Sequence, residues 1–454
     1  MTSRWQWLLK QLGRRLWFRA GLLSLLAVAT AMLAIVIEPL IPSGLPTRIG
    51  ADAVDDILNI LATSMLAVTT FSLTTMVSAY GAATNNVTPR ATKLLIEDPT
   101  SQNVLATFVG SFLYGLVGII TLSTGAYGDE GRVVLFFVTI GVIALIVVTL
   151  LGWIDHLATL GRVGETTDRV ERAVSKAVAA RIENPYLGGR RLADPDRDVP
   201  AAARPLYSPR IGYVQYVDVE SLSDCAEEHG GEIYVVSPPG AFVEPSRPLA
   251  WLHAIAGERV EKRIRSAFEI DDERSFDQDP RFGLSVLAEI ASRALSPAVN
   301  DAGTAIDVIG RSVRVLSIWA DSDSGERNGA ADRGADGASD GAAGERGEVR
   351  CPRIFVPPIE VGDLFDDAFW PIGRDGASVI EVQVRLQKAL LTLSKIGGTR
   401  FAEHAARHAR LALERAERAL ELEEEKERVR TIAAATLSQQ TASRERVAAK
   451  SVGA

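Results

Sequence analysis

Long apolar stretches alternate with short charged connections over the first third of the chain. Four such stretches reach the length of about 20 helical residues that crosses a hydrocarbon core of about 30 Å. They run from Phe18 to Ile37, Ile57 to Tyr80, Asn103 to Gly125 and Val133 to Ile154, without an ionisable residue in their interiors. The pattern predicts a membrane α-helical protein, with four transmembrane helices in residues 18–155 followed by a cytosolic α+β and helical region.

The amino-terminal segment, residues 1–17, is basic and amphipathic. Its Trp5, Leu8, Leu9, Leu12 and Leu16 fall on one helical face, which predicts a helix lying in the inner headgroup layer. The first apolar stretch is longer than the core of a signal peptide and is followed at once by Glu38-Pro39, so we expect an uncleaved anchor.

Lys and Arg near the ends of the apolar stretches predict the orientation, because these side chains resist translocation. They gather in the amino-terminal flank, in the second connection and after the fourth stretch: Arg4, Lys10, Arg14, Arg15, Arg19, Arg90, Lys93, Arg162, Arg169 and Arg172. The other two connections hold only Arg48 and Arg132, beside several acids. Both termini are therefore predicted to be cytoplasmic.

The second apolar stretch is rich in hydroxyl side chains. Thr63, Thr70, Thr74 and Ser78 share one narrow face at 100° per residue. They would either line a water-filled path shared by several subunits, or bond to neighbouring helices and to carbonyls one turn earlier in their own helix. No carboxylate, Lys or His lies within the stretches, so the transport hypothesis is limited to passive conduction.

The remaining two thirds of the chain have an ordinary charged composition. Residues 212–217 and 232–236 alternate as strands do. Residues 321–349 are Gly, Ala, Asp and Arg without periodicity, and we expect them to be disordered. Residues 159–182 are helical in pattern and are predicted to continue the fourth membrane helix. The predicted divisions are a helical extension and loop (156–208), a small α+β unit (209–260), a helical region (261–320), the insert (321–350), a second helical region (351–420) and a fraying charged tail (421–454).

Polar residues gather where two of the cytosolic helices are predicted to meet. Asn300-Asp301 stands before a helix over residues 304–319, and either residue is suited to cap it. The alternative is a small polar site for an ion or anion, formed by Arg293, Asn300, Asp301 and Thr304.

Composition and charge argue against several classes of function. The mean hydropathy is +0.11, whereas soluble enzymes of this size usually fall below zero. The net charge of −8 argues against a nucleic-acid partner, and two distant cysteines argue against a disulfide scaffold. No catalytic pairing, phosphate loop or zinc spacing is present, and His404 and His408 lack a third ligand, so we expect no enzyme, no cofactor and no metal.

Three runs together resemble a known family. They are Asn85-Asn86-Val87-Thr88-Pro89-Arg90, Asp279-Pro280-Arg281-Phe282-Gly283-Leu284 and Arg293-Ala294-Leu295-Ser296-Pro297-Ala298-Val299-Asn300-Asp301. They are similar to the bacterial predicted-membrane-protein family called domain of unknown function 2254, over most of the chain as far as about Arg410. The resemblance implies four membrane segments in the bacterial inner membrane and a cytosolic carboxy-terminal region, and it implies no activity. This chain has Trp153-Ile154-Asp155-His156 where the family has an aromatic-Ile-His-His run, so any metal or proton role of the histidine pair is in doubt.

Two functions remain. The first is a homo-oligomeric passive channel for ions or small solutes, with a cytosolic regulatory region. The alternative is a membrane-anchored cytosolic sensor or scaffold without transport activity. Both imply the lipid bilayer as a partner, and the ligand is unspecified.

Overall fold

The structure is a computed structural model that describes residues 53–124, 129–331 and 349–452, with isolated positions between 18 and 29. These residues form two compact units, residues 4–166 and residues 167–454. The predicted amino-terminal segment (1–17) and first transmembrane stretch (18–37) lie outside the described residues, apart from those isolated positions.

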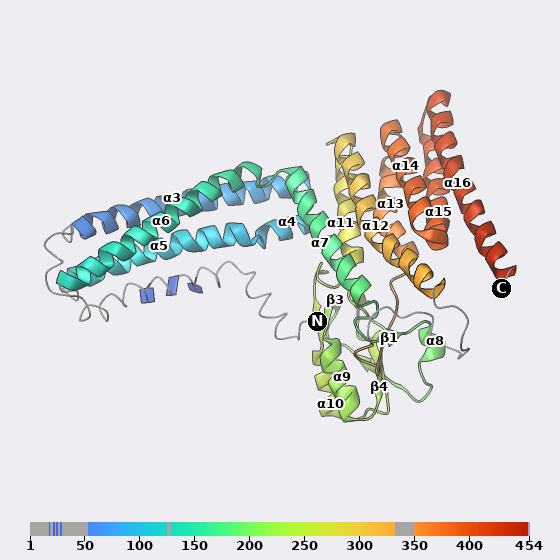
Figure 1. Ribbon diagram of the computed structural model, residues 1–454, viewed down its shortest axis with the longest axis horizontal. Coiled ribbons are helices and arrows are strands. Elements are labelled where there is room, and N and C mark those ends of the chain that lie inside the picture. The colour runs from blue at the N-terminus through green and yellow to red at the C-terminus, as the bar shows by residue number, and fades with distance from the viewer. Residues whose placement is uncertain are drawn as a thin grey trace. The chain divides into compact units, whose positions relative to one another are not determined.

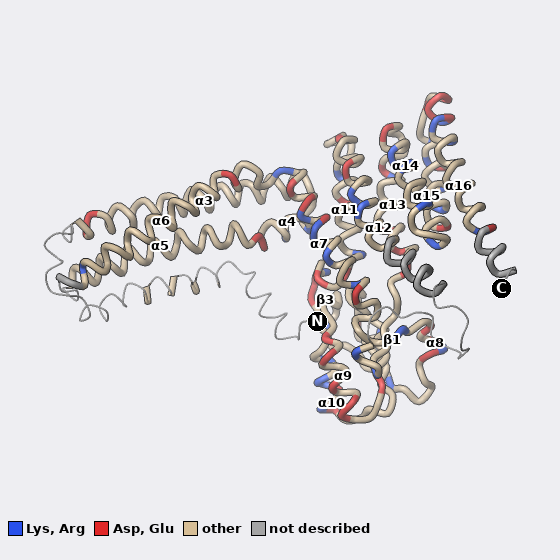
Figure 2. Tube along the Cα trace, in the orientation of Figure 1, with Lys and Arg blue, Asp and Glu red and all other residues tan. Residues whose placement is uncertain are grey.

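The first unit is helical. Three helices are long and apolar enough to cross a membrane: α3 (Val54–Asn86), α5 (Pro99–Ser123) and the Gly131–Thr159 part of α6 (Asp129–Thr159). They contain the second and fourth predicted stretches and the third as far as Ser123, and the short helix α4 (Pro89–Ile96) joins α3 to α5 (Figure 1). Charged side chains are sparse along the three long helices and frequent on the helices of the second unit (Figure 2).

Local sequence explains where α4 and α5 begin. Thr88 precedes α4, and its Oγ1 accepts from the backbone N–H groups of Arg90 (3.2 Å) and Ala91 (3.3 Å). Asp98 precedes α5, and its Oδ2 accepts from the N–H of Ser101 (2.8 Å). A proline follows each capping residue, at the position where a missing N–H costs nothing.

Buried polar contacts hold the three long helices together. Trp153 on α6 donates from Nε1 to the Ser72 hydroxyl on α3 (3.0 Å), and both residues are buried. The Tyr114 hydroxyl on α5 lies 2.9 Å from the Thr139 hydroxyl on α6. Large apolar side chains such as Phe71 and Val148 point outward, as expected of a lipid-facing surface.

The fourth predicted membrane helix does not continue unbroken into the next one. Helix α6 ends at Thr159, and α7 (Val163–Glu183) begins after a turn. Gly161 in this turn has a φ of +80°, and a Cβ at that position would lie 2.9 Å from the carbonyl oxygen of Ala79. The left-handed backbone of Gly161 therefore ends the helix, a local feature that apolar periodicity does not reveal.

The second unit contains two small sheets. The first has the order β1 (Arg190–Arg191), β8 (Ile354–Val356), β4 (Glu232–Val235), β6 (Pro248–His253) and β2 (Arg204–Tyr207). Strand β8 is parallel to β1 and β4, whereas β6 is antiparallel to β4 and β2. The second sheet is antiparallel, with the order β5 (Phe242–Val243), β3 (Gly212–Val217) and β7 (Phe268–Asp271).

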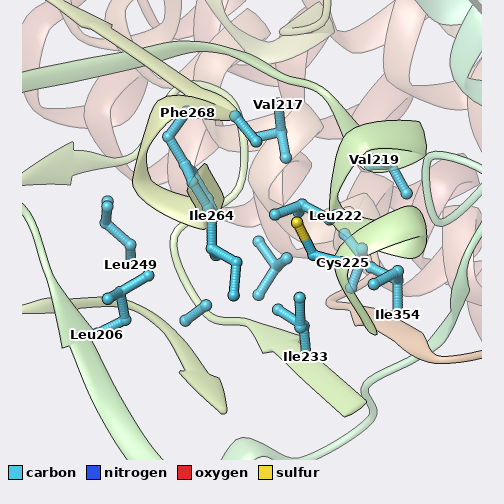
Figure 3. Packing of buried hydrophobic residues seen from close by; sticks show 14 of the residues in the cluster. Leu206, Val217, Val219, Leu222, Cys225, Ile233, Leu249, Ile264, Phe268 and Ile354 are labelled. Carbon is cyan, nitrogen blue, oxygen red and sulfur yellow. The ribbon is translucent and has the colours of Figure 1, made fainter. Parts of the chain in front are cut away.

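A single apolar core joins both sheets to helices α9 (Val219–Glu228) and α10 (Glu258–Ser266). Leu222, Cys225, Ile233, Ile264 and Ile354 gather in this core (Figure 3). The predicted α+β unit, residues 209–260, was too small. It omitted β1, β2 and β7 and the short helix α8 (Pro195–Asp198), and it omitted β8, which pairs with β4 from far along the chain.

The rest of the second unit is helical. Besides α7, its helices are α11 (Pro280–Ala294), α12 (Ala302–Ala331), α13 (Val361–Asp375), α14 (Ile380–Ile396), α15 (Gly398–Ala419) and α16 (Glu423–Val452). Helix α12 continues to Ala331, so the first part of the predicted disordered insert is helical. Residues 332–348 lie outside the described residues.

The predicted fraying tail is also a helix. Helix α16 buries Val429 and Ala433, and it packs with α14 and α15. Its first turn consists of Glu423, Glu424 and Glu425, whose negative charges are favourable at a helix amino terminus. The acidic run therefore begins a helix and does not belong to a fraying tail.

Candidate functional site: a pocket between α11, α13 and α15

The hydroxyl residues predicted to line a pore share the exposed side of α3. Thr63, Thr70, Thr74 and Ser78 are all exposed in the first unit. Three of them donate to carbonyl oxygens one turn earlier in α3, each at 2.9 Å: Thr63 to Asn59, Thr70 to Leu66 and Thr74 to Thr70. These hydroxyls are therefore satisfied without a neighbouring helix, and none of the four is buried among the described helices of this unit.

Of the predicted polar site, the structure joins two residues. Asp301, immediately before α12, accepts from the N–H (3.0 Å) and the hydroxyl (2.5 Å) of Thr304. These hydrogen bonds lower the pKa of Asp301 below its usual value. Asn300 has a φ of +51° in the turn, and Arg293 lies in the last turn of α11. Among the described residues, no hydrogen bond connects Arg293 with Asp301 or Thr304, and the arrangement is that of a helix cap.

Residues 279–283 determine where α11 begins and how closely it packs against α7. Asp279 caps the helix by accepting from the N–H of Phe282 (3.1 Å), and its other carboxylate oxygen accepts from Nε of Arg274 (2.8 Å). Gly283 faces Val174 of α7, where a Cβ would lie 2.1 Å from a Val174 methyl carbon. The run therefore fixes the start of α11 and its close approach to α7.

One turn further along α11, a pocket of about 490 Å³ opens towards α13 and α15. It is lined by Ser285 and Glu289 of α11, by Asp366, Asp367, Trp370 and Pro371 of α13, and by Arg407 of α15. Three carboxylates and one guanidinium thus surround an indole and a proline ring, a combination of apolar and polar groups suited to binding a small molecule.

Arg281 fixes one wall of this pocket. It forms ion pairs with Asp367 (Nε to Oδ2, 2.7 Å) and with Asp363, both on α13. Burial raises the pKa of Asp367 above its usual value, although the pairing with Arg281 opposes this shift. The carboxylate of Asp367 therefore lines the pocket while it is paired with Arg281.

His408 of α15 contacts Asp366, another residue that lines the pocket. Its side chain is 4% exposed, and its Nε2 lies 2.9 Å from Oδ1 of Asp366, which also accepts from Arg407 at 2.6 Å. Burial lowers the pKa of His408 to about 4, while Asp366 opposes the shift. The imidazole is therefore neutral at pH 7, and we assign the tautomer that donates from Nε2.

Trp370 forms the aromatic surface of the pocket. The guanidinium carbon of Arg407 lies 5.5 Å from its ring centroid, and that of Arg415 lies 5.0 Å away. Arg415 also donates to the backbone carbonyl of Trp370 at 3.2 Å. The indole is still 38% exposed, so it can also contact a ligand.

A second polar cluster ties α5 to α6 in the first unit. Nε2 of His156 lies 3.1 Å from both Oδ2 of Asp98 and Oγ of Ser101, and the Ser101 hydroxyl donates to Asp98 at 2.8 Å. Both partners contact the same imidazole nitrogen, so the ring does not relay between them as it would in a catalytic triad. This cluster is a link between two helices.

The sequence alone did not reveal the pocket. In the sequence His404 and His408 form a pair of histidines four residues apart, whereas in the structure the partner of His408 is Asp366 of α13. The described residues contain no group of three or more His, Cys, Asp or Glu side chains arranged to hold a metal ion. Arg281, Ser285 and Glu289 are spaced four residues apart, which places them on one face of α11. This spacing is the feature of the sequence that could have indicated the α11 side of the pocket.

The fold and the pocket define a helical membrane protein with three candidate spans and a large mixed unit that contains a polar pocket. The chain belongs to the family described as predicted membrane protein, domain of unknown function 2254, whose model matches residues 13–392. Uncharacterised proteins of Mycobacterium bovis and of Mycobacterium tuberculosis are each 29% identical over 325 residues, which cover 69% of this chain. The match spans 60% of the length of those relatives. No solved structure matches the chain.

Proposed function

We propose that the protein is a membrane-anchored receptor that binds a small ligand in the pocket between α11, α13 and α15. The pocket itself carries the proposal, because charged and aromatic side chains from three helices line one concave surface. We also propose that the ligand is bound and not chemically converted. In support, the Ser285 hydroxyl donates to the backbone carbonyl of Arg281 (3.1 Å) in its own helix, and not to a base.

A search for bound metabolites tests this function. The full chain in detergent micelles would be dialysed against a protein-free bacterial extract, and the retained small molecules would be identified by mass spectrometry. We expect at least one compound to be enriched by the wild type and lost in Ser285→Trp, which fills the pocket. Ser246→Trp, at an exposed position in the loop between β5 and β6, is the matched control. Equal retention by the wild type and Ser285→Trp would contradict the proposal.

The receptor is proposed to lie in the bacterial inner membrane with both termini in the cytoplasm, as the Lys and Arg distribution indicates. Alkaline phosphatase is active only after export, so a fusion after Ala454 should be inactive. The same enzyme fused after Thr124, just past the end of α5, should be active because α5 would end on the outer side. The reverse pattern of activity would refute the orientation.

The exposed hydroxyl face of α3 supports a second candidate, a homo-oligomeric passive channel. Thr63, Thr70, Thr74 and Ser78 would line an axis shared by several copies. In liposomes, Thr70→Trp should then reduce ion flux by at least about tenfold, because an indole replaces a small hydroxyl in the path. Leu73→Trp, at an exposed apolar position on a different side of α3, is the control. Equal flux through wild type and Thr70→Trp would exclude this candidate.

A further inference from the structure

The ion pairs of the pocket indicate the chemical class of its ligand. We infer that the pocket binds a zwitterionic α-amino acid with an apolar side chain, a molecule whose ammonium and carboxylate groups are joined to the same carbon. This inference rests on the proposed receptor function, since it names the ligand of the same site. Three observations carry it: the pairing of the lining charges, the further contacts of one pair, and the closeness of its two groups.

Two carboxylates of α13 line the pocket, and each is paired with an arginine. Asp367 pairs with Arg281 at 2.7 Å, and Asp366 pairs with Arg407 at 2.6 Å. Arg281 also pairs with Asp363, so two carboxylates of α13 hold it in place. In the Arg407–Asp366 pair both partners line the pocket, and the Arg407 side chain is 42% exposed. A ligand is therefore better placed to separate this second pair than the first.

Both partners of the Arg407–Asp366 pair have a further contact. Nε2 of His408 donates to the same oxygen of Asp366 at 2.9 Å, and the guanidinium of Arg407 lies 5.5 Å from the ring centroid of Trp370. These contacts reduce the cost of moving Arg407 away from Asp366. The indole stays in place during this movement, because Arg415 contacts its ring at 5.0 Å and donates to its backbone carbonyl.

The charge of the ligand follows from what each kind of ligand would leave behind. A cation bound to Asp366 would leave the guanidinium of Arg407 without a carboxylate. An anion bound to Arg407 would leave Asp366 with only the imidazole of His408, which is neutral at pH 7. A zwitterion binds Asp366 through its ammonium and Arg407 through its carboxylate, so every charge remains paired. Charge balance therefore favours a zwitterion.

The closeness of the two groups limits the spacing of the charges in the ligand. Nη1 of Arg407 and Oδ1 of Asp366 are 2.6 Å apart. An ammonium and a carboxylate on one carbon fit between them after a small outward movement of Arg407, whereas charges at the two ends of a chain require a large one. The apolar side chain would lie against Trp370 and Pro371, which line the same pocket. Its volume of about 490 Å³ is ample for an amino acid.

L-Leucine and four related compounds separate these features. Without its carboxylate it becomes 3-methylbutan-1-amine, and without its ammonium it becomes 4-methylpentanoate. The alcohol 3-methylbutan-1-ol carries neither charge, and 6-aminohexanoate is an isomer of leucine with its charges at opposite ends. The full chain in micelles would carry 5-fluorotryptophan at its seven Trp positions, and the ¹⁹F resonance missing from Trp370→Phe would be assigned to Trp370. At pH 7 leucine should shift this resonance saturably, with a dissociation constant at least about tenfold below those of the other four.

Two variants should change the preference in opposite directions. Arg407→Gln removes the partner of the ligand carboxylate, so it should weaken leucine binding about tenfold without weakening that of the amine. Asp366→Asn removes the partner of the ammonium, so it should weaken leucine binding about tenfold without weakening that of 4-methylpentanoate. A merely structural role would weaken all compounds alike. Arg410→Gln, at an exposed position of α15, is the matched control and should bind leucine as the wild type does. The other six resonances report whether each variant remains folded.

Each outcome bears on the inference. Selective binding of leucine, with the two opposite changes in the variants, supports it. Equal or tighter binding of any of the four related compounds overturns it, as does a Trp370 resonance that leucine does not shift. Equal weakening of all compounds in the folded variants also overturns it. The receptor function is judged separately by metabolite retention, so a retained compound of another class would leave that function intact while excluding an amino acid.

Discussion

Replacing Gly283 with alanine should lower the free energy of unfolding of the second unit by about 3 kcal/mol, the upper range for inserting a methyl group into a packed interface. The new Cβ would lie 2.1 Å from one methyl carbon of Val174 and 3.0 Å from its Cβ. Valine is stiff at χ1, so the clash is relieved only if α7 and α11 move apart. The helical preference of alanine returns at most about 1 kcal/mol.

Urea unfolding of the full chain in micelles measures this effect, and a double-mutant cycle locates it. Val174→Ala alone should destabilise by leaving a cavity, because Val174 is fully buried. In Gly283→Ala with Val174→Ala, the two changes should compensate, so the double variant should be more stable than the sum of the single variants predicts. Gly164→Ala in α7 is the control, since no atom lies within 4 Å of its added Cβ. An additive cycle would show that Gly283 and Val174 are not in contact.

The stability of the second unit should fall as the pH is lowered from about 6.5 to 4, and His408 should account for on the order of 3 kcal/mol of that fall. Burial lowers the pKa of His408 to about 4 in the folded protein. In the unfolded chain the imidazole binds a proton near its ordinary pKa of 6.5. Between these values the unfolded state takes up a proton that the folded state does not. The stabilisation is therefore complete above pH 6.5 and is lost as the pH falls towards 4.

His408→Gln provides the comparison, because an amide can donate to Asp366 but does not titrate in this range. Urea unfolding at pH 7, 6, 5 and 4 should give parallel pH profiles for wild type and His404→Gln, which keeps His408. The profile of His408→Gln should be flatter. Identical slopes for wild type and His408→Gln would mean that His408 is not buried in the folded protein.

Sequence reasoning succeeded where the cause of a structure is local. The three candidate spans follow from runs of apolar residues, whose length relates directly to the thickness of a bilayer. The helix predicted over residues 304–319 lies within α12, and Asp301, one of the two residues suited to cap it, accepts from the N–H of Thr304. Strand β3 coincides with the alternating residues 212–217.

Prediction from the sequence was wrong where a turn, or a partner distant in the chain, determines the structure. Gly161 ends α6 through a left-handed backbone and a close contact with Ala79. The charged residues from 421 onward are predicted to fray, although the break at residues 420–422 makes the acidic run at Glu423 the start of α16. Charge alone does not distinguish the two ends, since the effect depends on which end of the helix dipole the acids meet.

The sequence by itself thus determined the three candidate spans, the cap of α12 and the membership of a membrane-protein family, because each depends on residues that are neighbours in the chain. Only the tertiary structure decided the pairing of β8 with β4, the partner of His408 and the pocket. These features bring together residues from separate helices or strands, such as Ser285, Trp370 and Arg407. Their meeting depends on how whole elements pack, and no local pattern in a single sequence records that packing.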